Sequence, residues 1–196
     1  MTTFNLLLTP RGIAYLTNIY NSALRNQYFP KEWKSSITIS IPKPSKNPKS
    51  PTSNRPTSLL PIMGKIFEKL ILKQMFDYIS SGNLIPNYQF GFKAQHSTSH
   101  QLLRLTEYMQ QAFQNKNNVI AIFLDGQQAF DRVWHTGLIY KMFQMGFPIY
   151  LIQLLRSFLT DRTFVTRIGS TTSKIKPILA GSPKGSPLSP ILYNLY

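Results

Sequence analysis

Apolar residues recur at helical spacing in five stretches of the chain. In the first, Ile13, Leu16, Tyr20 and Leu24 share one face, and Pro10 stands near the start. The second stretch ends at a Ser-Gly-Asn turn that follows Ile79. The spacing therefore predicts helices over residues 9–29, 62–81, 97–115, 136–146 and 149–160.

Other segments follow the patterns of strands. Residues 37–41 alternate between isoleucine and hydroxyl side chains, which predicts a half-buried strand. Residues 119–124 are continuously apolar, the pattern of a strand buried on both faces. Residues 162–168 and 174–179, with Gly169-Ser170 after the first, predict a hairpin. This order of helices and strands favours an α+β fold over regular βαβ repeats.

The chain is strongly basic. Its 196 residues include 22 Lys+Arg and 7 Asp+Glu, a net charge of +15. The basic excess is densest near the start, where residues 42–58, rich in Pro, Ser, Lys and Asn, predict a mobile basic loop. Such a charge favours nucleic-acid binding, since phosphate contacts release counterions. A merely basic domain, or one that binds sulfate-like ligands or anionic membranes, is the alternative.

Composition excludes several classes of protein. The absence of cysteine excludes disulfide frameworks, thiolate zinc sites and cysteine nucleophiles. No apolar run exceeds residues 119–124, far short of a membrane span, and residues 1–10 do not resemble a signal peptide. We therefore expect an intracellular protein, in the nucleus or the cytoplasm, with no membrane partner.

Two of the seven carboxylates stand apart from the rest. Asp125 ends the predicted buried strand and precedes Gly126, which suits a Mg²⁺ ligand or equally a cap of the next turn. For Asp131 we expect a helix cap or an ion pair with Arg132. The other five are expected to be surface charges: Glu32, Glu68, Asp77, Glu107 and Asp161.

Common catalytic motifs are missing. The histidines are scattered, and no Gly-x-Ser-x-Gly elbow, P-loop or dinucleotide fingerprint occurs. The glycines of residues 181–185 would allow a ligand to approach the backbone, and Lys184 could meet a phosphate or a nucleic-acid strand. A plain irregular turn explains this segment equally well.

Six groups of motifs together resemble the reverse transcriptases of non-LTR retrotransposons of the jockey type, and they run in order through nearly the whole chain. They are FPKEWK (29–34), IPKP with NRPTSLL (41–44 and 54–60), KIFEK (65–69), QFGF with HST (89–92 and 96–98), FLDGQQAFDRVWH (123–135) and AGSPKGSPLSP (180–190). The last two resemble the first and second palm motifs of that family.

The resemblance implies a right-hand polymerase fold and an RNA-directed DNA polymerase. Residues 1–118 would form the fingers, with the basic loop 42–58, and residues 119–196 an incomplete palm that ends before the Asp-Asp motif, with the thumb absent. The implied cofactor is Mg²⁺, with Mn²⁺ as a substitute. The implied partners are an RNA template, a DNA primer and deoxynucleoside triphosphates.

The resemblance also implies roles for single residues. Asp125 would be the catalytic carboxylate and would hold the metal ions, together with the Gly126 carbonyl. Phe130 would be the steric gate against a ribose 2′-OH. The incoming nucleotide would also meet the Gln128 and Ala129 amides, Arg55 and Lys43, and the template or primer would meet Lys184 and Gly185.

The sequence departs from the family pattern at three places. Lys184 stands where the family has Gln, and Ser182 where it has Val. Gln127-Gln128 replaces a pair of the Glu-Lys kind. The family's Tyr/Phe-x-Asp-Asp motif is expected beyond Tyr196, so we expect this chain alone to be inactive. A noncatalytic nucleic-acid-binding remnant and a drifting product without a stable fold are the alternatives.

Overall fold

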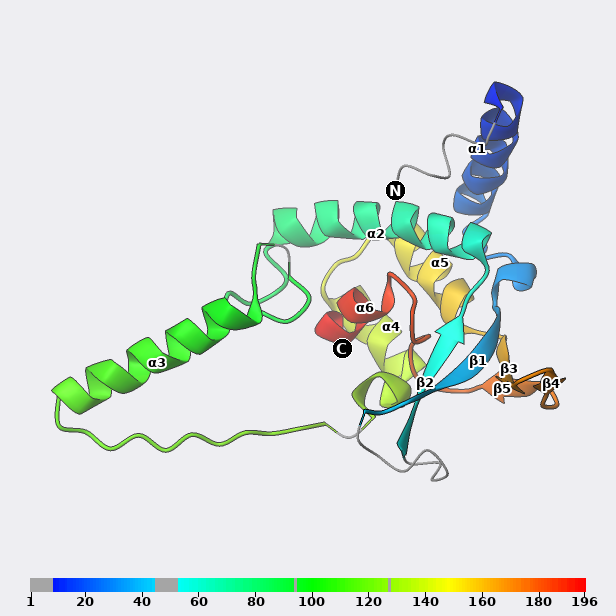
Figure 1. The fold of residues 1–196 in the computed structure, drawn as a ribbon. Helices are drawn as coiled ribbons and strands as arrows, with labels where there is room; N and C mark the ends of the chain where they lie inside the picture. Colours follow the sequence, from blue (N-terminus) through cyan, green and yellow to red (C-terminus); the bar gives the residue numbers. More distant parts are fainter. Residues whose placement is uncertain (1–8, 45–52, 94, 127) are drawn as a thin grey trace.

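The computed structural model describes residues 9–44, 53–93, 95–126 and 128–196. Helices and strands alternate irregularly along them, as the sequence predicts for an α+β chain (Figure 1). The helices are α1 (Pro10–Arg25), α2 (Ile62–Gly82), α3 (Thr98–Gln114), α4 (His135–Gln144), α5 (Ile149–Leu159) and α6 (Ser189–Leu195), with 3-10 turns η1 (Lys31–Trp33) and η3 (Ala129–Arg132). The strands are β1 (Ser35–Pro42), β2 (Asn54–Leu59), β3 (Arg162–Ile168), β4 (Thr171–Thr172) and β5 (Lys176–Ile178).

Among the described residues, one five-stranded sheet joins β1 and β2 to the later strands β3, β4 and β5. The order is β2-β1-β3-β4, and β5 also pairs with β3. Strand β1 runs antiparallel to β2 and parallel to β3, with Ile37 opposite both Leu59 and Val165. The predicted hairpin over 162–168 and 174–179 is present, because β3 pairs antiparallel with β4 and β5.

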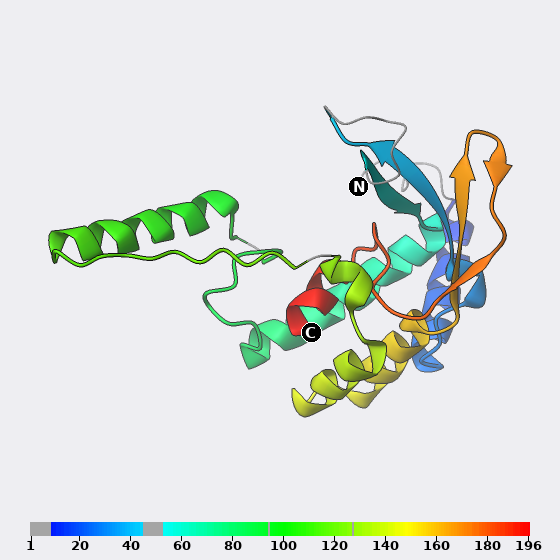
Figure 2. The same cartoon turned by 90° about the horizontal axis from the view of Figure 1, so that it is seen from below.

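The core lies among the helices beside this sheet (Figures 1 and 2). At one end, aromatic rings interlock: the Phe29 centroid lies 5.0 Å from Phe158 and 5.6 Å from Phe67. The Phe67 ring stacks on Tyr20 of α1 at 5.6 Å. Helices α4, α5 and α6 add buried aliphatic side chains, among them Leu138, Leu155 and Leu192. Aromatic pairs of this kind stabilise a core beyond the area that they bury.

The predicted helices are confirmed, with ends that move by up to four residues. The prediction of a basic loop over 42–58 is wrong in part, because Asn54–Leu59 forms strand β2. Residues 45–52 of that loop lie outside the described residues. Composition argued against a strand, yet β2 is an edge strand, where Pro56 can pair with Ser40 although it lacks an N–H group.

Helix α3 and the chain after it form an arm, defined as residues 98–126. It projects from the rest of the molecule, and the extended chain from residue 115 returns from its far end (Figures 1 and 2). None of the helix's residues is buried, and its apolar residues Leu102 and Phe113 are each 62% exposed.

The prediction of a strand buried on both faces over residues 119–124 is wrong. These residues are in no strand, and Phe123 and Leu124 are 83% and 93% exposed. A strand buried on both faces needs neighbours that cover it, and no described residue pairs with this run. The apolar pattern of residues 119–124 indicates that these side chains favour burial, but it does not identify the partner that would bury them.

Among the described residues, no helix combines the length and the apolar character needed to cross a membrane.

Candidate functional site

The turn η3 is the first part of the candidate site. Gln128 enters it with a left-handed backbone (φ 54°), and its carbonyl accepts a hydrogen bond from Asp131 N at 2.9 Å. The Phe130 ring packs between Tyr193, at 4.9 Å between centroids, and Phe92, at 5.9 Å. A Cβ on Gly126 would lie 3.6 Å from the Ala129 Cβ, so the chain just before the turn approaches it closely.

A loop of residues 181–188, the glycine loop, is fastened to this turn. Gly181 N donates to Val133 O at 2.9 Å and Ser182 N to Phe130 O at 2.8 Å. The backbone of Gly181 has φ +85°, and a Cβ there would lie 2.8 Å from the Asp131 backbone. Only glycine combines that conformation with so close an approach. The structure therefore brings the two predicted palm motifs together through main-chain contacts.

An ion pair is a further contact between η3 and the glycine loop, and we call the place where these two elements meet the junction. Lys184 Nζ lies 2.6 Å from Asp131 Oδ2, and both side chains are more than one third exposed. The expectation of a pair with Arg132 is therefore wrong, since Asp131 pairs with Lys184 instead. The loop fastened by Gly181 turns back across the Asp131 backbone and carries Lys184 to the carboxylate.

The loop also contacts the sheet. Gly185 has φ +89°, and a Cβ on it would lie 2.9 Å from the Ser58 carbonyl of β2. A cleft of about 240 Å³ lies between the loop and the sheet. Its lining residues come from four strands, the turn and the loop: Thr38, Pro56, Ser58, Asp131, Phe164, Ile178 and Ala180 to Lys184.

The predicted phosphate ligands lie on the β1–β2 hairpin. Arg55 is exposed on β2, opposite Ile41 in register and next to Pro56 of the cleft wall. Lys43 directly follows β1, and its backbone N–H donates to Ser53 O at 2.8 Å. Both cations are thus on the strand pair that faces the glycine loop.

Asp125 and Gly126 take no part in the hydrogen bonds that join η3 to the glycine loop, although Gly126 lies close to Ala129. Asp125 is exposed in an extended segment, so the expected position at the end of a buried strand is wrong. Within the described ranges, which contain all seven acidic residues, no three His, Asp or Glu side chains gather as a metal site would require. One carboxylate and one carbonyl are too few to fix two ions about 3.5–4 Å apart. The described residues do not form a complete metal centre.

Comparison with protein-family models identifies the family to which the chain that carries this junction belongs. The family model for reverse transcriptase (RNA-dependent DNA polymerase) matches residues 41–196, which include β2, η3 and the glycine loop. The chain belongs to the reverse transcriptase family.

Relatives from mobile elements agree with this assignment. This reverse transcriptase chain is 46% identical over 190 residues to the RNA-directed DNA polymerase from mobile element jockey of Drosophila melanogaster. It is 44% identical to the probable RNA-directed DNA polymerase from transposon BS of the same species. These matches cover 97% and 96% of the chain but 21% of each relative, so the chain spans about one fifth of their length. The predicted resemblance to jockey-type elements is confirmed.

The sequence reasoning missed one polar residue of this reverse transcriptase chain. Glu68, expected at the surface, is fully buried in α2, where its carboxylate accepts a hydrogen bond from the Ser186 hydroxyl at 2.5 Å. Burial raises the pKa of Glu68 to about 7, although Ser186, Arg162 and Lys65 act in the opposite direction. The signal was available, because Glu68 stands three and seven residues before the buried Ile71 and Met75.

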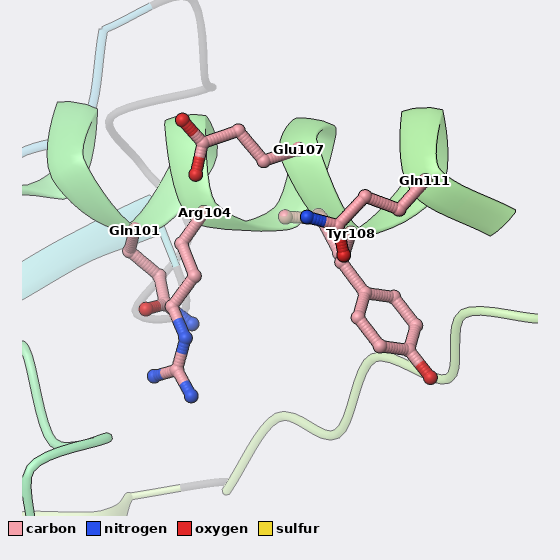
Figure 3. Close-up of a pocket in the computed structure, with 6 residues that line it drawn as sticks. Gln101, Arg104, Glu107, Tyr108 and Gln111 are labelled. Carbon is pink, nitrogen blue, oxygen red and sulfur yellow. The ribbon is translucent and has the colours of Figure 1, made fainter. Parts of the chain in front are cut away.

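A second hollow, of about 380 Å³, is lined by residues of α3 alone (Figure 3). Tyr108, Glu107 and Gln111 belong to it, as does Arg104, whose guanidinium lies 5.8 Å from the Phe90 ring centroid. None of the predicted site residues lines this hollow. In the reverse transcriptase chain it is a feature of one exposed helix face.

Proposed function

We propose that this chain is the segment of a mobile element's RNA-directed DNA polymerase that receives the incoming nucleotide and the template–primer. The observation that carries the proposal is the junction of η3, the glycine loop and β2, which lies within the region of the family match. Residues 1–118 would serve as fingers and residues 119–196 as part of a palm, in a right-hand polymerase fold.

The nucleotide would be held between the turn and the hairpin. Phe130 would exclude a ribose 2′-OH, a role supported by the packing of its ring against Tyr193. The backbone N–H groups of Gln128 and Ala129 stand at the start of η3, where a helical turn offers no partner of its own. Arg55 and Lys43 would bind the triphosphate from the β1–β2 hairpin.

Lys184 and Gly185 would meet the template or primer strand. Gly185 is exposed in the middle of the loop, and its missing side chain lets the loop pack closely against the Ser58 carbonyl of β2. Lys184 differs from the Gln of the family pattern, and its ammonium is already neutralised by Asp131. Its contact with a phosphate would therefore compete with an internal ion pair.

Asp125 and the Gly126 carbonyl would supply part of a Mg²⁺ site. Phosphoryl transfer depends on positioning and on neutralising the charge of the phosphates. A complete site would need further carboxylates, since the described residues form no group of three His, Asp or Glu side chains that could hold a metal ion. We therefore expect no polymerase activity from the 196-residue chain alone.

A chimaera tests the proposal. The matching 190 residues of the jockey polymerase would be replaced by this chain, and RNA-templated primer extension would be measured with Mg²⁺ or Mn²⁺. We expect DNA synthesis that Asp125→Asn abolishes, with Glu107→Gln on the exposed arm as the matched control. A chimaera that folds and binds its primer–template but never extends it would count against the proposal.

A noncatalytic nucleic-acid-binding remnant is the second candidate, supported by the net charge of +15. Fluorescence anisotropy of the purified chain with an RNA·DNA duplex tests it. Binding should weaken steeply between about 50 and 200 mM salt, because each phosphate contact releases counterions. Duplex binding by this chain together with an inactive chimaera would favour this second candidate over the first.

A further inference from the structure

A buried polar cluster lies behind the glycine loop, outside every predicted site residue. Glu68 of α2 is 0% exposed, Arg162 at the start of β3 is 1% exposed, and Ser186 of the loop is 5% exposed. Among the described residues, Glu68 Oε1 and the Nε and Nη2 atoms of Arg162 have no hydrogen-bond partner. Holding two ionisable groups in a core at this cost in free energy calls for a physical reason.

The hydrogen bonds of the cluster run through Ser186. Its hydroxyl donates to Glu68 Oε2 at 2.5 Å and accepts from Leu188 N at 3.1 Å. Arg162 is held separately: its Nη1 donates to Phe158 O at 3.1 Å, and its guanidinium lies 4.7 Å from that ring's centroid. The Glu68 carboxylate is thus the acceptor that ties the second half of the loop to α2.

The first half of the loop is fastened elsewhere. Ser182 N is bonded to Phe130 O of η3, as described above, and Ser189 Oγ donates to Pro183 O at 2.8 Å. Lys184 and Gly185 stand between the attachment to η3 and the attachment to Glu68. A loop held at both ends presents its middle residues in one geometry, and this preorganisation lowers the entropy that binding costs.

We propose that Glu68 is a positioning residue of this polymerase segment: through Ser186 it fixes Gly185 and Lys184 for contact with the template–primer, without touching nucleic acid itself. This inference rests on the proposed function of those two residues. The acceptor oxygen of Glu68 does the positioning, so an uncharged acceptor of the same shape keeps it.

Four variants of the purified chain test the role. Glu68→Leu removes the acceptor, Ser186→Ala removes the donor, and Glu68→Gln keeps an acceptor oxygen. Ser157→Ala is the matched control, since it removes a hydroxyl that accepts from Phe29 N at 3.0 Å, far along the chain from the loop. The readouts are hydrogen exchange at the amide of residue 186, which donates to Pro183 O at 3.0 Å, and the Kd for an RNA·DNA primer–template duplex. The Leu188 amide is left out, because Ser186→Ala removes its acceptor directly.

We expect Glu68→Leu and Ser186→Ala to speed loop exchange and to raise Kd by about five- to tenfold, the equivalent of one buried hydrogen bond. Glu68→Gln should stay within about twofold of the wild type in both readouts, on the same scale. Ser157→Ala should leave loop exchange and Kd unchanged even where its melting temperature falls. A structural role alone would make Ser157→Ala and Ser186→Ala alike in Kd.

Three outcomes would overturn the inference. Unchanged loop exchange in Ser186→Ala would show that Ser186 does not anchor the loop. Faster exchange with an unchanged Kd would show that the anchor does not position the loop for binding. A Glu68→Gln variant as weak as Ser186→Ala would assign the effect to the charge. Should Glu68→Leu fail to fold, Ser186→Ala and Glu68→Gln still decide. A wild-type chain that binds no duplex would instead contradict the proposed function, while its loop exchange still tests the anchor.

Discussion

The junction around the glycine loop is tightly packed, whereas the arm of residues 98–126 has almost no contacts that bury it. At the junction, η3, the loop, α2 and β2 meet through hydrogen bonds and two glycines in close backbone contact. On the arm no residue of α3 is buried, and the apolar run that follows is exposed. Contacts among its own residues hold the junction in one conformation, whereas the arm has an apolar surface that no described residue covers.

This contrast divides the candidate site itself. Phe130, Lys184 and Gly185 belong to the junction, while Asp125 lies at the end of the arm. The residues proposed to contact the nucleotide and the template are therefore held in place by the junction, whereas the proposed metal ligand Asp125 is not. Local contacts thus fix the proposed binding residues, whereas the proposed metal site would need further structure around Asp125.

The largest expected effect on stability comes from a substitution at Gly181 that disrupts the junction. Gly181→Val would force a branched side chain into a left-handed backbone and against the Asp131 main chain, at 2.8 Å for the Cβ alone. We expect a loss of roughly 4 kcal/mol in unfolding free energy, from backbone strain and overpacking together. Urea unfolding measures it. The control is Gly169→Ala, at φ +60° with no atom within 4 Å, which should cost about 1 kcal/mol.

The next largest effect is a pH dependence of the unfolding free energy that arises from Glu68. The folded-state pKa of about 7 lies above the ordinary glutamate value of 4.5, so the folded chain holds this proton more tightly than the unfolded chain. Unfolding free energy should fall as pH rises from about 4.5 to about 7, by roughly 3 kcal/mol, and then level off. Arg162, one of the charges that oppose the shift, remains cationic across this range, because its pKa, lowered by burial, is about 10.

Urea unfolding at several pH values, compared with Glu68→Gln, isolates this contribution. The variant cannot titrate at that position, so its stability should lack this fall. Equal slopes in the two proteins would mean that Glu68 ionises in the folded chain as readily as in water.

These two predictions use residues that sequence reasoning treated very differently. The glycines of the loop were expected to let a ligand approach the backbone or to form a plain turn, and in the structure Gly181 and Gly185 approach the Asp131 backbone and the Ser58 carbonyl. Glu68 was assigned to the surface as a charged residue with polar neighbours, although its helical position matched Ile71 and Met75. Spacing was the stronger signal at that position, since the face of a helix sets burial before the residue type does.

Tertiary partners explain the remaining differences between sequence and structure. The helices were predictable because their periodicity is local. Strand β2 was hidden by a loop-like composition and formed through register with β1. The apolar run 119–124 predicted a buried strand, but a sequence pattern cannot state which partner would bury it.

A smaller effect concerns the ion pair within the junction. Lys184→Gln removes the pair with Asp131, which is partly exposed and therefore worth about 0–1 kcal/mol. The melting temperature should change little, and the change should shrink further in high salt, where the pair is screened. Calorimetry at about 50 mM and 1 M salt measures both. Asp131→Asn is the partner variant, and a large salt-independent loss in either one would mean that the pair is a structural element of the junction.

The smallest effect on stability is expected on the arm. Phe123→Ser and Leu124→Ser replace side chains that are already 83% and 93% exposed, so unfolding free energy should change by less than about 0.5 kcal/mol. Phe67→Ala in the buried aromatic cluster is the contrast, at about 3–5 kcal/mol. The same serine variants should reduce aggregation, because an exposed apolar run without a pairing partner invites association between chains. Urea unfolding and light scattering separate the two effects. A serine variant that lost several kcal/mol would show that the arm is buried in solution, and the contrast between the two regions would fail at that point.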